Sequence, residues 1–239
     1  YGRGHYDFEE GTMIFTAPNQ VIQTDEKQDH SNDEGWMLFF HPDLIRTTVL
    51  GETIDEYSFF SYESNEALHL SDQEKKIIYD CVKNIELEYN TNIDELSRDL
   101  FVSNLQLMLN YCRRFYNRQF RTRTTQQKDV VSAFEKNLKT YFRSEDLSNI
   151  GQPSVHYFAE RAHLSPNYLS DLLKKETGKN IKEHINDTIV NLAKTQLLNS
   201  SNSVSEIAYS LGFNYPHYFS RMFKSQTGFT PAKYRESIN

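Results

Sequence analysis

Residues 166–178 read PNYLSDLLKKETG, and residues 216–228 read PHYFSRMFKSQTG. Six of these thirteen positions are identical, and three more are apolar in both stretches. Each stretch opens with Pro and closes with Gly, which are favoured at the first position of a helix and just after its end. The pattern therefore predicts one structural unit that occurs twice in the C-terminal half of the chain.

A shorter helix and a tight turn are expected before each of these stretches. Ala159 and Ala208 lie in the shorter helices, where a small side chain lets two helices cross closely. Four residues later the turn requires a positive φ, which Gly212 adopts freely and His163 adopts more often than most residues. Helix, tight turn and helix at this spacing predict two helix-turn-helix units.

The second helix of each unit has a buried and an exposed face. The residues expected to point inward are Leu169, Leu172 and Leu173 in the first copy and Phe219, Met222 and Phe223 in the second. The opposite stripe is Asn167, Ser170, Asp171 and Lys174 in the first copy and His217, Ser220, Arg221 and Lys224 in the second. These stripes either face the major groove of DNA or are ordinary solvated faces, and their presence in both copies favours DNA.

Arg221 and Asp171 occupy the same position of the two stripes and differ in charge. Arg221 is the candidate for a bidentate contact to guanine. Asp171 is unusual beside phosphates, and it would either accept a hydrogen bond from cytosine N4 or orient a neighbouring side chain. The two units are therefore expected to contribute unequally to DNA binding.

A further short helix is expected after the second stretch. Thr230 suits its N-cap and Pro231 its first position. Phe229 and Tyr234 are expected to anchor this helix, and Lys233 and Arg235 either contact phosphate or are solvated.

Charge divides the chain into halves of different character. Residues 1–112 carry 7 Lys and Arg against 22 Asp and Glu, whereas residues 129–239 carry 13 against 11. The basic stretch 113–128, with 6 Lys and Arg and no acid, lies between them and would contact the acidic half or flanking phosphate. The acidic half should repel phosphate, so any DNA contacts belong to the C-terminal half.

The N-terminal half changes its periodicity part-way along. Short apolar runs at 12–16 and 36–40 between turn residues predict β-strands. From Ser71 a capping box opens a helix, and a second helix follows from about Asn92. The apolar face of the second helix either packs only on its neighbours or also binds a second copy of the chain.

The stretch 122–129 has no apolar residue and predicts a linker. Helices are expected behind it over 130–142 and 180–198. The predicted domains are therefore an N-terminal sensor and dimerisation domain over 1–121, the linker over 122–129, and a DNA-binding domain over 130–239.

Several function classes find no support in the sequence. No apolar run approaches the roughly 18 residues of a membrane span, and residues 1–10 contain no apolar signal-peptide core. Cys81 and Cys112 read as reduced core thiols of a cytoplasmic protein, with a disulfide or a reactive thiol as the alternative. The sequence predicts no metal site and no cofactor, because the spacing of His5, His30, His41 and His69 does not suit metal ligation.

The run from Ile207 to Arg235, IAYSLGFNYPHYFSRMFKSQTGFTPAKYR, resembles the signature of the AraC/XylS family of transcription regulators. The resemblance covers about residues 130–239. It implies two helix-turn-helix units joined by the helix at 180–198, with their reading helices in successive major grooves. By position, the base-reading residues of the family fall on Asn167, Ser170 and Asp171 and on Pro216, His217 and Arg221. Asp171 departs from the basic residue often found there.

The N-terminal half resembles, more loosely, the cupin-like sensor domain of this family. The resemblance lies in residues 10–20 and 35–42, and residues 111–120 resemble the end of its dimerisation helix. The expected fold is α+β: a partial cupin-like β-barrel without the strands that normally precede Tyr1, then dimerisation helices, then an all-α domain. Its aromatic residues suit either a sugar-stacking pocket or an ordinary barrel core: Phe15, Trp36, Phe39 and Phe40.

The function implied is sequence-specific transcription regulation controlled by a small-molecule effector such as a sugar or related metabolite. The expected partners are double-stranded DNA, the effector and a second copy of the chain, with RNA polymerase as a further candidate. Two alternatives stay open. An enzyme is one, because cupin barrels can hold catalytic metals, although the sequence has no nucleophile elbow, P-loop or dinucleotide fingerprint. A DNA-binding protein whose N-terminal half only dimerises is the other.

Overall fold

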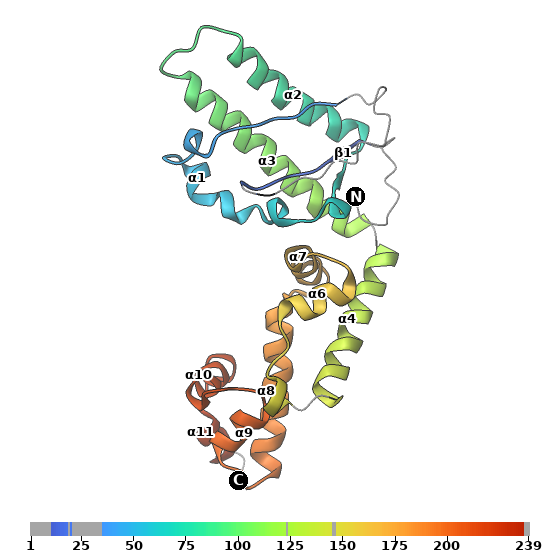
Figure 1. Ribbon diagram of the computed structural model, residues 1–239, viewed down its shortest axis with the longest axis vertical. Coiled ribbons are helices and arrows are strands. Elements are labelled where there is room, and N and C mark those ends of the chain that lie inside the picture. The colour runs from blue at the N-terminus through green and yellow to red at the C-terminus, as the bar shows by residue number, and fades with distance from the viewer. Residues whose placement is uncertain (1–10, 19, 21–34, 123, 145–146, 237–239) are drawn as a thin grey trace. The chain divides into compact units, whose positions relative to one another are not determined.

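The computed structural model describes residues 11–18, 20, 35–122, 124–144 and 147–236. The chain divides into two compact units, Tyr1–Thr122 and Arg123–Asn239, and each is described by itself (Figure 1).

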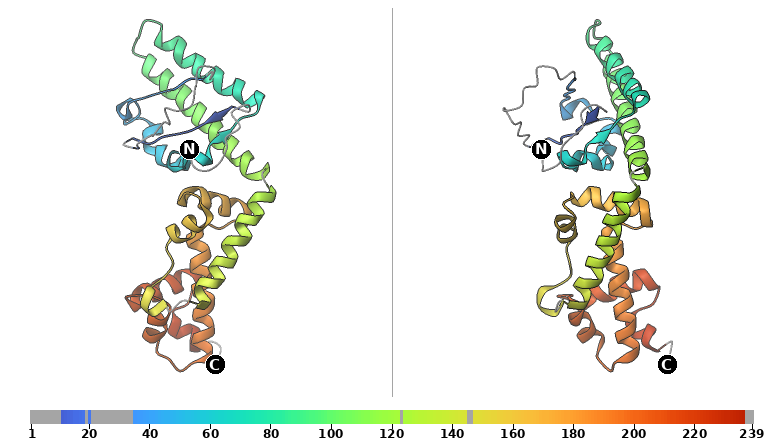
Figure 2. Two further views of the ribbon diagram at one scale, coloured as in Figure 1. Left: turned by 45° about the vertical axis from the view of Figure 1, so that its right-hand side comes forward. Right: turned by 90° about the vertical axis from the view of Figure 1, so that its right-hand side faces the viewer.

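Two long helices dominate the described part of the first unit. They are α2 (Asp72–Tyr89) and α3 (Ser97–Thr122), which lie side by side as a hairpin in every view (Figures 1 and 2). The predicted capping box at the start of α2 is confirmed, because the Ser71 side chain accepts from the Glu74 N–H and the Glu74 carboxylate accepts from the Ser71 N–H. Cys81 and Cys112 are free thiols buried between the two helices.

The prediction of a partial cupin-like β-barrel is wrong. In the described residues of this unit, the only sheet has two strands, β1 (Thr12–Met13) and β2 (Leu68–His69), paired antiparallel with Thr12 opposite His69. The segment between them folds into helix α1 (Val49–Thr53) and the 3-10 turns Pro42–Leu44, Ile54–Glu56, Ser58–Ser61 and Ser64–Glu66. The extended segment 36–40 pairs with no strand among the described residues.

The aromatic residues expected in a barrel have divergent environments. Phe15 is buried, with its ring 4.4 Å from that of Phe59. Trp36 and Phe39 are 41% and 79% exposed, so they form neither a barrel core nor a closed pocket here. Short aromatic and β-branched runs between turn residues predicted strands, but strands require partners, and local sequence does not identify those.

Two side chains of α3 form hydrogen bonds with the backbone at and next to β2. The buried Gln119 accepts a hydrogen bond from the His69 N–H at 2.8 Å and donates to the Ala67 carbonyl at 3.1 Å. Arg118 donates to the His69 carbonyl at 2.6 Å and forms an ion pair with Glu74 at 2.7 Å. The basic stretch therefore contacts the acidic half in part, as one of its two sequence interpretations proposed.

The second unit is all α, as the sequence predicted. Its helices are α4 (Thr124–Ser144), α5 (Leu147–Ile150), α6 (Val155–Ala162), α7 (Pro166–Thr177), α8 (Ile181–Asn199), α9 (Val204–Ser210), α10 (Pro216–Thr227) and α11 (Pro231–Glu236). Their apolar faces share one core around α8, which contributes Ile181, Ile185, Ile189, Ala193 and Leu197. Among the described residues, no helix is both long and apolar enough to cross a membrane.

Candidate nucleic-acid interface

Helices α6 and α7 form the first helix-turn-helix unit. The Ser154 side chain caps α6, and nine residues later His163 ends it in the left-handed conformation, with φ of 54°. His163 is the only non-glycine residue with positive φ in the described ranges, which confirms the turn predicted there. The buried Ser165 side chain then caps α7 by accepting from the Tyr168 N–H at 3.2 Å.

Helices α9 and α10 form the second helix-turn-helix unit. Its turn is longer than the turn of the first helix-turn-helix unit. Ser203 caps α9, and Gly212 adopts a φ of 79° nine residues later, again as predicted. From this position Pro216 follows after four residues, whereas Pro166 follows His163 after three. The added residue brings Tyr215 to the N-cap of α10, where no side chain caps the helix.

The ends of α7 and α10 repeat one another closely. Thr177 donates to the Leu173 carbonyl at 2.8 Å, and its hydroxyl accepts from the Lys179 N–H at 3.3 Å. Thr227 makes the same two bonds, to Phe223 at 2.7 Å and from Phe229 at 3.2 Å. Gly178 and Gly228 then adopt φ of 79° and 78°. These contacts confirm that the repeated sequence encodes repeated structure.

Burial of α7 and α10 follows the predicted faces. Leu169, Leu172, Leu173, Phe219 and Phe223 are each no more than 1% exposed, and Met222 is half-buried. The candidate DNA-contacting residues lie on the opposite side. Those fully exposed are Asn167, Lys174, His217, Arg221 and Lys224, and those half-buried are Ser170, Asp171, Pro216 and Ser220.

Charge distinguishes the two exposed stripes. In the described part of the chain, Arg221 and Lys224 have no ion-pair partner, so both cations are available to an anionic ligand. Asp171, the counterpart of Arg221, is half-buried and interacts within the protein. The α10 stripe is therefore more cationic than the α7 stripe.

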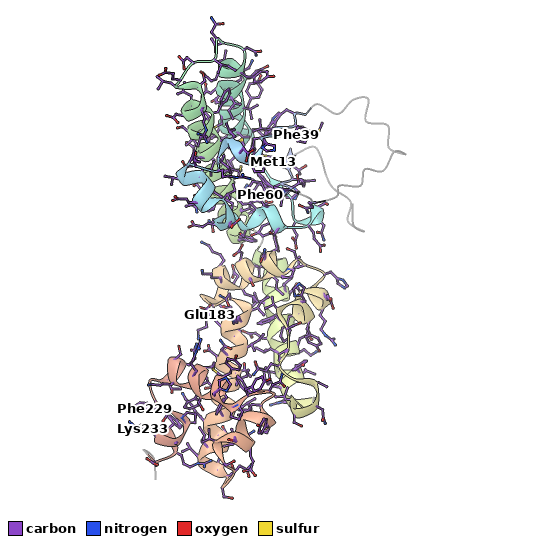
Figure 3. The ribbon with its side chains drawn as sticks, turned by 60° about the vertical axis from the view of Figure 1, so that its left-hand side comes forward. Met13, Phe39, Phe60, Glu183, Phe229 and Lys233 are labelled. Carbon is purple, nitrogen blue, oxygen red and sulfur yellow. The ribbon has the colours of Figure 1, made fainter. Side chains whose placement is uncertain are left out.

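The structure gives Arg235 a role that the sequence did not predict. Its Nε donates to the Leu197 carbonyl at 2.9 Å and its Nη2 to the Asn202 carbonyl at 2.7 Å, so it closes the C-terminal end of α8. Tyr234 packs on Phe223 with ring centroids 5.5 Å apart, as the predicted anchor of α11. Phe229 does not anchor it, since it is 52% exposed and projects with Lys233 from the edge of the unit (Figure 3).

Comparison with known proteins agrees with this architecture. The model of the helix-turn-helix domain matches residues 158–237. The uncharacterized regulator YijO of Escherichia coli is 31% identical over 132 residues, which are 55% of this chain and 44% of YijO. The transcriptional activator RhaR of Yersinia pseudotuberculosis is 30% identical over 107 residues, 45% of this chain and 33% of RhaR. The C-terminal domain of the chain is therefore a helix-turn-helix domain of the AraC/XylS type.

This chain spans less than half of the length of these relatives. A solved structure of the DNA-binding domain of AdpA in complex with a target DNA is 26% identical, covers 46% of this chain and 90% of that one, and has a TM-score of 0.38.

The histidines considered as metal ligands have ordinary surroundings where the structure describes them. His41 is exposed beside Asp43, and the backbone of His69 is held by Gln119. His5 and His30 lie outside the described residues. Within the described ranges, no three potential metal-binding side chains lie together.

Proposed function

We propose that this chain is a sequence-specific regulator of transcription whose helices α7 and α10 enter the major groove of double-stranded DNA. The observation that carries this proposal is the duplicated exposed stripe of α7 and α10, on helices whose inner faces are buried except at the half-buried Met222. A reading helix needs a rigid inner face and a polar outer face, and both copies provide them. Such a protein acts in the cytoplasm, where bacterial DNA is accessible.

The stripes assign different contacts to their members. Arg221 is exposed and unpaired among the described residues, and its planar guanidinium suits the O6 and N7 acceptors of guanine. Lys224, one turn later, suits a phosphate as a point charge. Asn167, Ser170, Lys174, Pro216, His217 and Ser220 complete the proposed interface, with Asp171 as the one acidic member.

The test is selection of preferred duplexes from a random pool by the full chain, followed by titration of variants at fixed salt. Arg221→Ala should weaken binding by about 1–3 kcal/mol and relax the preference at one base pair. Lys224→Ala should weaken binding to all sequences uniformly. It should also reduce the number of counterions released on binding by about one, which is measured as a smaller slope of log K against log salt concentration. Lys139→Ala, which removes an exposed cation of α4 outside both stripes, is the matched control. Equal binding of all duplexes by the unmodified chain would refute sequence-specific recognition.

A homodimer is supported by an apolar surface on the α2–α3 hairpin. We call it the hairpin-tip surface, and it consists of Leu87, Tyr89, Ile93, Leu96 and Leu100, which are 47–72% exposed. Several large apolar side chains exposed within one short segment of a protein favour an interface there. Leu96→Gln with Leu100→Gln should therefore shift the sedimentation coefficient from dimer to monomer, and monomeric behaviour of the unmodified chain would contradict this assignment.

A small-molecule effector, such as a sugar or related metabolite, completes the proposal, with RNA polymerase as a further partner. The support is that the first unit forms a compact body separate from the AraC-type domain. A ligand that binds one conformation preferentially would alter DNA binding by its difference in affinity. Thermal stabilisation of the full chain by a sugar library tests this, and a library without any effect would favour a first unit that only dimerises.

A further inference from the structure

Three aromatic side chains are exposed at the leading end of α10. Tyr215 and Tyr218 are 59% and 54% exposed, and His217 between them is exposed too. The His217 and Tyr218 rings lie 4.2 Å apart, and the Tyr215 ring lies 5.9 Å from that of Tyr218. Their mutual contacts hold a small aromatic surface beside the proposed DNA-binding stripe.

The longer turn of the second unit explains why this surface exists. Its added residue places Tyr215 at the N-cap of α10, where the first unit has the small, buried Ser165. Tyr215 forms no capping bond through its side chain, so its ring contributes to neither the helix end nor the core. Because Tyr215 stabilises neither the helix end nor the core, a contact with a binding partner would explain its position.

The position of Tyr218 suggests what it meets. Residues three apart lie on the same side of a helix, so Tyr218 neighbours Arg221. The first residues of a reading helix are those closest to base edges. Among major-groove edges, only the 5-methyl group of thymine is apolar, and it sits beside the acceptors and donors of adjoining base pairs. The face of a tyrosine ring is apolar and suits this methyl group, whereas polar base edges would be bound through its hydroxyl, and Tyr218→Phe distinguishes the two contacts.

We infer that Tyr218, supported by Tyr215, packs against the 5-methyl group of a thymine next to the base pair contacted by Arg221. This inference rests on the proposed function, and it adds an apolar determinant to an interface whose other members, apart from Pro216, are polar. The same chemistry would recognise 5-methylcytosine, whose methyl group occupies the same place on the pyrimidine ring.

The test uses the full chain and the duplex that it selects. Each thymine is replaced in turn by deoxyuridine, which removes only the methyl group. One thymine next to the Arg221-dependent base pair should show about three- to fivefold weaker binding, the effect expected for burial of one methyl group. Tyr218→Ala should bind the thymine and deoxyuridine duplexes equally, whereas Tyr218→Phe should keep the difference.

Phe229→Ala is the matched control, because Phe229 is an equally exposed aromatic residue beyond the far end of α10, and it should keep the thymine preference. The inference is overturned if no thymine is sensitive to deoxyuridine. It is also overturned if Tyr218→Ala binds both duplexes more weakly but keeps the preference for thymine, which would indicate a backbone contact. Failure to select any preferred duplex would overturn the proposed function as well, and that result is distinguishable from the other two.

Discussion

Backbone geometry at single residues sets the two turns of the AraC-type domain. Gly212 has positive φ, and a Cβ added to it would lie 2.9 Å from the Gly151 carbonyl carbon and 3.0 Å from the Leu147 carbonyl oxygen. Gly178 has the same φ with nothing within 4 Å of an added Cβ. A comparison of substitutions at these two glycines therefore distinguishes the cost of backbone strain from the cost of steric contact.

Gly212→Ala should lower the free energy of unfolding of the second compact unit, residues 123–239, more than Gly178→Ala does. Both variants place a Cβ in the left-handed region, which costs about 1–2 kcal/mol. Only Gly212→Ala also forces apart backbone atoms, at about 1–3 kcal/mol more. The midpoints of urea denaturation measure the difference, and equal midpoints would show that the loop after α5 yields without cost.

The stability of the second compact unit, residues 123–239, should depend on pH through the protonation of His184. Its Nε2 lies 2.7 Å from the Thr177 hydroxyl and its ring packs edge-on against Phe134. Burial, followed by the charge of Lys179, lowers the pKa of His184 below its ordinary value. The unfolded chain therefore takes up this proton more readily than the folded chain.

Stability of the second unit should accordingly fall as the pH drops below about 6.5, the ordinary histidine value, and be retained above it. The His184→Gln variant should lose this part of the pH dependence in urea denaturation between about pH 5 and 7.5. His156→Gln, at an exposed position of α6, should follow the unmodified chain. Identical pH profiles for all three proteins would exclude His184 as a source of the effect.

Sequence predicted the local features of this domain well and its tertiary contacts poorly. The positive φ of His163 and Gly212 followed from helix spacing, because a turn that follows an apolar periodicity has few solutions. The Arg235 contacts did not, because they join residues 33 and 38 positions apart. The charge of an arginine beside a proposed DNA-binding helix fits phosphate equally well, and only the structure shows its carbonyl partners.

At the scale of elements, Arg235 joins α11 to the end of α8. It donates to two carbonyls that have no helical partner beyond the end of α8, Leu197 and Asn202. Arg235→Ala should destabilise the unit by about 1–3 kcal/mol, because these are bonds from a charged donor. Lys233→Ala, on the same short helix, should change stability by no more than about 0.5 kcal/mol. Chemical denaturation of both variants tests this, and a stable Arg235→Ala that binds DNA weakly would instead indicate a phosphate contact.

Elements of the first unit were predicted unevenly for a physical reason. Helices α2 and α3 rest on local hydrogen bonds and a capping box, which sequence reveals. The expected strands rest on partners distant in the chain, so the runs at 12–16 and 36–40 predicted strands where only Thr12 and Met13 pair. The roles of the candidate DNA-contacting side chains remain predictions, since their exposure permits DNA contact without demonstrating it.

At the scale of the whole molecule, each unit has a core of its own. The core of the second compact unit draws on α4, α6, α7, α8, α9 and α10, with Tyr234 of α11 packed against it. Residues 123–239 alone should therefore fold cooperatively and unfold at the same urea midpoint as the second unit of the full chain, measured by circular dichroism. A fragment that melts without cooperativity would show that the first unit supports the second.

The unequal turns also constrain how the two helix-turn-helix units can be exchanged. Positions before the turn correspond at an offset of 49 residues, as Ser154 and Ser203 do, and positions after it at 50, as Pro166 and Pro216 do. A chimaera that swaps reading helices must therefore cross over at the prolines. A crossover placed before the turn would transfer the longer turn together with Tyr215. The first helix-turn-helix unit would then carry an exposed tyrosine ring where it now has Ser165.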